Sequence, residues 1–148
     1  MSDYITRFIP DDPYYILNAD EIRQIKSIVW RGNAVSVEVN DVILFADAGE
    51  NFESVLCPLC KSDLKNNWGK IMGEAYADGY GFVNLDFITS CCNKSTSLQN
   101  LIYYFQQGFY KSIVEVVPDL QSNIDEVEIC KLLMQITGVT WRVIHSRL

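Results

Sequence analysis

Two closely spaced pairs of cysteines constrain this chain more than any other feature of its sequence. Cys57 and Cys60 have the spacing C-x2-C, and the vicinal pair Cys91 and Cys92 follows after residues 61–90. The C-x2-C spacing lets two sulfurs reach one ion from a tight turn, and a structural zinc ion takes four such ligands in a tetrahedron. The sequence therefore predicts that these four cysteines bind one structural Zn²⁺ ion.

Disulfide, redox and inert-thiol interpretations of the cysteines fit the sequence less well. Residues 1–10 contain no apolar run of the length that a secretory signal needs, so a cytoplasmic, reducing location is expected. A thioredoxin-like redox pair needs its first cysteine at the start of a helix, whereas the helical pattern begins several residues after Cys60. An inert buried thiol suits the isolated Cys130 but not two clustered pairs.

The sequence does not decide whether both cysteines of the second pair bind the ion. Neighbouring residues on a strand point to opposite faces, so Cys91 and Cys92 both bind one ion only if the chain turns there. Residues 93–95 (Asn-Lys-Ser) are typical of a turn. If only one of the two cysteines binds, another side chain completes the site. The candidates for that replacement are His145, the only histidine, and then Asp63 and Asp86.

Length and charge restrict the class of protein and of partner. The 148 residues are expected to form a single α+β domain (1–148), which is large enough to bury a core without a metal. The formal net charge is −7, from 12 Lys and Arg against 19 Asp and Glu, which disfavours nucleic acid as a partner and favours a basic protein. No stretch is long and apolar enough to predict a membrane span.

Strand-like and helix-like patterns alternate along the chain. Outside the cysteine region the pattern predicts strands at 4–9, 35–39, 42–46, 113–117 and 140–146, with a turn at 40–41. It also predicts helices from Asn18 to Gly32 and from Ser122 to Gly138. Between the two groups it predicts an extended segment at 52–56, a helix through 68–75 that ends at Gly79, a strand at 83–87 and a helix from Ser97 to Gly108.

The beginning and the end of the chain have similar patterns. In both, a strand runs into Pro-Asp (residues 8–11 and 116–119), and a helix and a further strand follow. Two such strand–helix–strand units can share one sheet, although local turn signals explain the similarity equally well. The predicted fold is α+β, an antiparallel or mixed sheet with flanking helices and an inserted zinc-ribbon-like lobe at residues 52–108.

Several motifs lie between Asn51 and Asp119. They are N-F-E-S-V-L-C-P-L-C at 51–60, Trp68, the pair at 91–92, T-S-L-Q-N-L-I-Y at 96–103, Gly108-Phe109 and V-V-P-D at 116–119. In this combination the chain resembles a group of small cytosolic bacterial proteins of uncharacterised function. The resemblance implies that the four clustered cysteines are the metal site, and it implies no activity. Lys61 departs from the pattern, because a glycine commonly follows the C-P-x-C turn in that group.

Two functions remain after a search for catalytic motifs. A single histidine and a zinc ion closed by four protein ligands leave little scope for catalysis, so an enzyme is not expected. The favoured function is a non-catalytic, zinc-stabilised interaction module of the immunity or antitoxin type, which meets a basic protein through an acidic surface. That surface is predicted at Glu115, Asp119, Asp125, Glu126 and Glu128. The alternative is a zinc-dependent hydrolase with three protein ligands and an acid–base residue among Glu53, Asp86 and His145.

Overall fold

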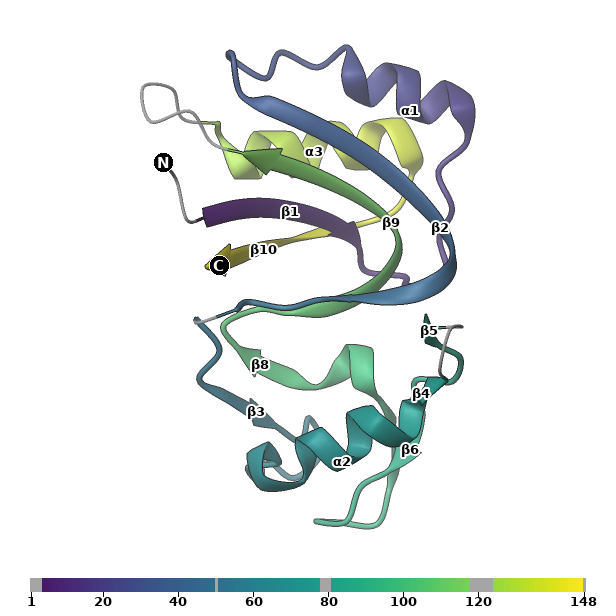
Figure 1. Cartoon of the computed structure of the whole chain (residues 1–148), viewed down its shortest axis with the longest axis vertical. Coiled ribbons are helices and arrows are strands. Elements are labelled where there is room, and N and C mark those ends of the chain that lie inside the picture. The colour runs from purple at the N-terminus through teal and green to yellow at the C-terminus, as the bar shows by residue number, and fades with distance from the viewer. Residues whose placement is uncertain (1–3, 50, 78–80, 118–123, 148) are drawn as a thin grey trace.

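The fold is mixed α+β, built on an antiparallel sheet. The computed structural model describes residues 4–49, 51–77, 81–117 and 124–147. The six-stranded sheet has the strand order β10-β1-β9-β2-β5-β4. Its four long strands are β1 (Tyr4–Pro10), β2 (Ala34–Ala46), β9 (Gly108–Val117) and β10 (Trp141–Arg147). The helices α1 (Ala19–Lys26) and α3 (Glu126–Thr137) lie on one face of these strands (Figure 1).

The four long strands and two helices form two interleaved strand–helix–strand units. β9 lies between β1 and β2, and β1 lies between β9 and β10, with every pairing antiparallel. The strands joined through α1 are therefore parallel to each other, and so are those joined through α3. This is the split β-α-β connectivity of ferredoxin-like sheets. The predicted fold class is confirmed, and the sequence similarity between the two ends of the chain corresponds to these two units.

The core of this four-stranded unit lies between the sheet and its helices. The strands contribute Phe8, Val114 and Val116 to this core, and all three side chains are fully buried. Ile25 from α1 and Leu133 from α3 close the other side of that core. The predicted capping box of α1 is present, since the Asn18 side chain accepts a hydrogen bond from Glu21 N and the Glu21 carboxylate accepts one from Asn18 N.

The prediction that the first helix continues to Gly32 is wrong. α1 ends at Lys26, and Val29, within the predicted helix, is 77% exposed. The indole Nε1 of Trp30 donates a 3.0 Å hydrogen bond to the Ile25 carbonyl. A continuing helix would need that carbonyl for the backbone N–H of Val29. Tertiary packing of the tryptophan therefore ends the helix earlier than the sequence pattern indicates.

The predicted hairpin at residues 40–41 is also wrong. β2 runs through these residues as one strand of 13 residues and pairs with β9 from Ala34↔Val117 to Ala46↔Gly108. The pairing register shifts between Val39 and Leu44, which marks a β-bulge. Asn40 and Asp41, which are typical of a turn, therefore lie at a bulge within one long strand.

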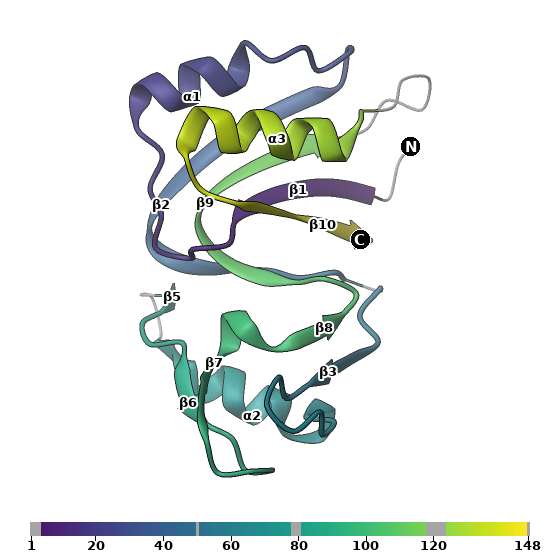
Figure 2. The same cartoon turned by 180° about the vertical axis from the view of Figure 1, so that it is seen from behind.

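The segment between β2 and β9, residues 47–107, forms a second region that we call the lobe. It lies on the sheet face opposite the helices, as the two views in Figures 1 and 2 show. Its helix is α2 (Lys65–Ala75), which begins before the predicted residue 68. Its strands are short: β3 (Ser54–Leu56), β4 (Tyr76–Ala77), β5 (Gly81–Phe82), β6 (Asp86–Ile88), β7 (Ser95–Ser97) and β8 (Ile102–Tyr104).

Three further predictions fail in the lobe. The helix expected from Ser97 to Gly108 is replaced by one turn of 3₁₀ helix at Leu98–Asn100 and by β8, which pairs with β3. The strand expected at 83–87 is displaced to β6, and Val83 is 63% exposed. The prediction that the helix after the first cysteine pair continues to Gly79 is also wrong: α2 ends at Ala75 and Tyr76–Ala77 form β4, while Gly79 itself lies outside the described residues. Leu98, Leu101 and Tyr103 are all buried, but in a core that surrounds the segment rather than along one helical stripe.

The lobe core is aromatic and includes side chains of the sheet. Trp68 stacks on Phe52 with ring centroids 5.1 Å apart and lies 5.6 Å from the ring of Phe45 on β2. Phe109 on β9 is fully buried and lies 4.9 Å from both Phe45 and Phe82. The lobe and the four-stranded unit therefore share a hydrophobic core through β2 and β9.

A buried glutamine joins the lobe to the four-stranded unit. The Gln99 side chain accepts a 2.7 Å hydrogen bond from Phe109 N and donates one of 2.9 Å to the carbonyl of Asp11. Asp11 in turn forms a 2.8 Å ion pair with Arg142 of β10. The adjacent Gly108 allows this close approach, because a Cβ there would lie 2.8 Å from Ile9 Cδ1 and 3.2 Å from Gln99 Oε1.

Among the described residues, the helices are too short and too polar for any of them to cross a membrane.

Candidate metal centre

Two turns of the lobe carry the four clustered cysteines. The first cysteine turn, residues 57–62, follows β3. Lys61 N donates to the carbonyl of Cys57 at 2.9 Å, and Cys57 N donates to the carbonyl of Ser62 at 2.9 Å. Lys61 has φ of 65°, in the left-handed region that glycine adopts most readily. This conformation explains why a glycine is common after a C-P-x-C turn, and Lys61 adopts it without being one.

The second cysteine turn, residues 89–94, has the same build. Asn93 N donates to the carbonyl of Thr89 at 2.8 Å, and Thr89 N donates to the carbonyl of Lys94 at 3.0 Å. Asn93 has φ of 55°, which asparagine tolerates better than most residues. The chain therefore turns at the vicinal pair, as binding by both cysteines requires.

Position by position, the two turns differ in where they carry sulfur. The first turn has cysteines at its first and fourth positions, Cys57 and Cys60. The second has Thr89 at the first position and Cys92 at the fourth, and its other cysteine, Cys91, stands third, where the first turn has Leu59. The sequence analysis missed Thr89, although the spacing T-x-x-C-N, set beside C-x-x-C-K, contains the signal.

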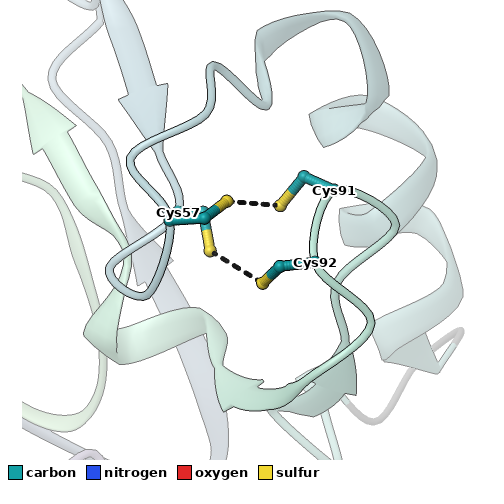
Figure 3. Close-up of side chains that lie close together, drawn as sticks. Cys57, Cys91 and Cys92 are labelled. Atoms are coloured by element: carbon teal, nitrogen blue, oxygen red, sulfur yellow. Dashed lines mark hydrogen bonds between the residues drawn. The ribbon is translucent and has the colours of Figure 1, made fainter.

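The four sulfurs lie close enough together to hold one ion. Their Sγ atoms are all within 4.8 Å of one another. Cys57 and Cys92 are 3.9 Å apart and face each other across the gap between the two turns (Figure 3). Cys60 and Cys91 are 3.3 Å apart. A tetrahedral ion with bonds of about 2.3 Å holds its sulfurs about 3.8 Å apart, so the arrangement fits a zinc-type site.

Burial divides the ligands into two pairs. Cys57 is fully buried in the lobe core and Cys92 is half-buried against it, and we call these the inner pair. Cys60 and Cys91 are exposed, and we call them the outer pair. Thr89 is 1% exposed, and its hydroxyl is hydrogen-bonded to Cys92 Sγ at 3.1 Å. The backbone N–H of Leu59 donates to Cys57 Sγ at 3.4 Å, so the inner pair has polar support from both turns.

Hydrogen bonds favour the thiolate form at the first turn. The side chain and backbone of Ser62 lower the pKa of Cys60 to about 6. Burial raises the pKa of Cys57, but the backbone N–H groups of Cys60 and Leu59 outweigh it, and the pKa is lowered overall. The hydrogen bond with Cys60 and then burial raise the pKa of Cys91. A bound cation would favour the thiolate form of the cysteines, because only deprotonated thiols bind a metal ion.

The proposed substitute ligands lie elsewhere. His145 Nε2 is 3.0 and 2.5 Å from the two carboxylate oxygens of Glu126, on β10 beside α3, and it is not part of the cysteine cluster. Asp63 accepts a hydrogen bond from Lys65 N, and Asp86 is paired with Ser97 on the β6–β7 hairpin. His145 is exposed and lies outside the cysteine cluster, so the geometry of this structure gives it no part in the candidate metal site.

The predicted acidic surface is smaller than expected. Glu115 lies on the sheet face away from the helices, 3.6 Å from Arg7, so it does not join the acidic groups of α3. Asp119 lies outside the described residues. Asp125, Glu126 and Glu128 do lie together at the start of α3, where Asp125 is the N-cap and accepts a hydrogen bond from Glu128 N.

The fold and the site define this chain as an α+β protein with a candidate four-cysteine metal centre in an inserted lobe. Comparisons with protein-family models, with curated proteins and with solved structures found no match. The resemblance to small bacterial proteins with a C-P-x-C turn stays a prediction, as does the zinc-ribbon-like character of the lobe. Fold and site must therefore carry the functional argument by themselves.

Proposed function

We propose that the protein is a non-catalytic binding module whose lobe is held together by one structural zinc ion. The observation that carries this proposal is the convergence of four sulfurs, from two turns of matching build, within 4.8 Å. Four protein ligands close a tetrahedral zinc site and leave no position for water or substrate. Thiolates also favour zinc over the harder cations Mg²⁺ and Ca²⁺.

The surroundings of the cysteines support a structural role. Cys57 belongs to the apolar core of the lobe, and the inner pair is bonded to backbone and hydroxyl groups rather than to an acid or base. The acid–base candidates of the hydrolase alternative lie outside the cysteine cluster. His145 on β10 is bonded to Glu126 of α3, Asp86 lies at the far end of the β6–β7 hairpin, and Glu53 precedes β3.

Metal analysis tests this proposal directly. Reduced protein, purified with zinc present, is expected to contain about one zinc per chain, and X-ray absorption should show four sulfur neighbours at about 2.3 Å. Zinc with three sulfurs and one oxygen, together with hydrolytic turnover that chelation abolishes and zinc restores, would establish the hydrolase instead. Metal-free reduced protein with a folded lobe would contradict both functions.

For the binding partner we propose a basic protein that approaches the start of α3. The net charge of −7 and the carboxylates of Asp125, Glu126 and Glu128 support this choice. Of these three carboxylates, Glu126 lines an apolar groove of about 410 Å³ between α3 and β10, where Val127 is 66% and Met134 50% exposed, whereas Asp125 and Glu128 face the side of α3 towards α1. A partner segment with an apolar centre and a basic end complements this surface, because opposite potential accelerates encounter and apolar contact gives affinity.

Charge reversal tests the partner proposal. Glu126→Lys with Glu128→Lys should lower the association rate constant for a basic protein and make that rate depend less on salt concentration. Salt slows electrostatically steered association because it screens charges more than about 8 Å apart at physiological ionic strength, and the double variant removes the attraction that salt would screen. Asp125 is kept because it caps the helix. The matched control is Asp41→Lys with Glu74→Lys, two exposed carboxylates away from α3. Equal effects of both double variants would show that only the overall charge matters and would contradict the proposed surface.

A further inference from the structure

The outer pair, Cys60 and Cys91, is exposed to solvent, and a purely structural zinc site does not require such exposure. Both outer thiols are exposed, their sulfurs are 3.3 Å apart, and they come from different turns. The inner sulfurs are 3.9 Å apart; Cys57 is fully buried in the lobe core, and Cys92 is half-buried against it. A dissolved oxidant therefore reaches one pair of thiolates before the other.

The build of the second turn explains the exposure of Cys91. If this turn repeated the first, its first ligand would stand at position 89, which is 1% exposed. Thr89 occupies that position, and the sulfur stands two residues later, where the equivalent residue of the first turn, Leu59, is 49% exposed. The second turn therefore carries this sulfur at the exposed Cys91 instead of at the buried position 89, while its backbone hydrogen bonds match those of the first turn.

We propose that the outer pair is an oxidation site for hydroperoxides, at which Cys60 and Cys91 form a disulfide and the bound ion is released. One outer thiolate attacks the peroxide, takes up one oxygen as a sulfenic acid and expels hydroxide. The other thiolate attacks that sulfur, forms the disulfide and expels the second hydroxide. Two protons convert the hydroxides to water, the two sulfurs together lose two electrons, and the O–O bond is reduced.

The consequence for the metal follows from the number of ligands. Oxidation removes two of the four thiolates, and the two sulfurs of the inner pair do not complete a tetrahedron. The disulfide still ties the first turn to the second, so the two turns remain linked covalently after the ion has left. This inference rests on the proposed function, because it requires that the four cysteines bind a metal ion.

The test uses zinc-loaded, reduced protein treated with one equivalent of hydrogen peroxide. We expect about one zinc released per chain, measured with a chromogenic chelator, and peptide mapping should find Cys60 joined to Cys91 as the first disulfide. Thiol reductant with added zinc should restore the starting state. A first disulfide between Cys91 and Cys92, between Cys57 and Cys60 or within the inner pair would overturn the inference, as would zinc that stays bound. Absence of zinc before oxidation would instead disprove the proposed function.

A matched variant separates exposure from general reactivity of the site. Thr89→Cys combined with Cys91→Ser keeps four cysteines in the cluster, but it moves one of them from the exposed position 91 to the buried position 89 of the second turn. It should bind zinc and release it about tenfold more slowly under peroxide, because solvent access limits the oxidation of thiolates. Release at the wild-type rate would overturn the inference. If this variant does not fold, Cys130→Ser in the wild-type background still allows the first disulfide to be mapped without the fifth thiol.

Discussion

The four-stranded unit and the lobe are built from the same chain but stabilised differently. The strands of the first are 7 to 13 residues long, and two amphipathic helices with side-chain caps cover one face of them. The lobe strands are 2 or 3 residues long, and α2 has no side-chain cap and no fully buried residue. Backbone pairing and apolar burial suffice for the first region.

This difference indicates that a bound metal ion would stabilise the lobe more than the four-stranded unit. Short strands and an uncapped helix supply little local stability, so the lobe depends on its aromatic cluster and on cross-links between its turns. The four sulfurs join the turn after β3 to the turn after β6, which are far apart in the sequence. A metal ion there removes much of the conformational freedom of the unfolded lobe, as a disulfide does for a long loop.

The largest effect is expected from removal of the metal ion. Cys57→Ser should abolish zinc binding and cost several kcal/mol, because zinc binding by small sites contributes about 10–16 kcal/mol to their folding. Hydrogen exchange should show loss of protection in β3, β6 and β8, with β1, β9 and β10 still protected. Cys130→Ser is the control, since Cys130 lies on α3 outside the cluster. Simultaneous loss of protection in both regions would show that they form one cooperative unit.

A smaller effect should follow when the junction between the regions is cut. Gln99→Leu leaves the buried N–H of Phe109 and the carbonyl of Asp11 without their side-chain partner, at a cost of about 2–4 kcal/mol. Denaturant unfolding followed by hydrogen exchange in the lobe strands β3 and β8 and in β1 and β10 should then separate into two transitions. Gln106→Leu, at an exposed position next to the junction, should leave a single transition.

The ion pair at the junction gives a pH-dependent test. Burial raises the pKa of Asp11, but the hydrogen bonds from Thr140 and Arg142 lower it below 3.8 overall. The ionised carboxylate therefore stabilises the fold above its unfolded pKa of about 3.9, and this stability is lost as pH falls through the lower folded pKa. Asp11→Asn should cost about 0.5–1 kcal/mol at pH 7, after screening of this partly exposed pair, and the cost should decrease as the pH falls from 5 to 3.

The control for that series is the exposed Asp41→Asn, which should change the free energy of unfolding little at either pH. Chemical denaturation at pH 3, 5 and 7 measures the difference between each variant and wild type. A cost of Asp11→Asn that stays constant down to pH 3 would show that packing of the side chain matters more than its charge.

The smallest effect is expected from strengthening the lobe helix. Gly73 lies inside α2, and a Cβ added there meets no atom within 4 Å. Gly73→Ala should therefore stabilise the protein by about 0.5–1 kcal/mol, because alanine loses less backbone entropy in a helix. Gly138→Ala should act oppositely, since Gly138 ends α3 with φ of 77°. Thermal unfolding of zinc-loaded protein measures both changes, and stabilisation by Gly138→Ala would contradict this account.

Much of the four-stranded unit was predictable from its sequence. β1 and β10 fall close to their predicted ranges, and α3 ends at the predicted Gly138, because apolar periodicity and stop residues act locally. The N-cap of α3 is Asp125, three residues after the predicted start of that helix. The cysteine spacing likewise predicted the four residues that converge. Of the carboxylates predicted to form an acidic surface, the structure brings Asp125, Glu126 and Glu128 together at the start of α3, whereas pairing with β1 directs Glu115 to the opposite face of the sheet.

Tertiary structure decided the features whose causes are distant in sequence. Trp30, whose ring packs against Phe8 of β1, ends α1 early, and pairing with β9 turns a predicted hairpin into one bent strand. The bonds of Gln99 to Asp11 and Phe109 replace a predicted helix. The division into inner and outer cysteines also depends on the fold, since the lobe core covers Cys57 and Thr89 but not Cys91. Local patterns determine which residues can form an element or bind a metal ion, whereas burial is set by segments that meet only when the whole chain has folded.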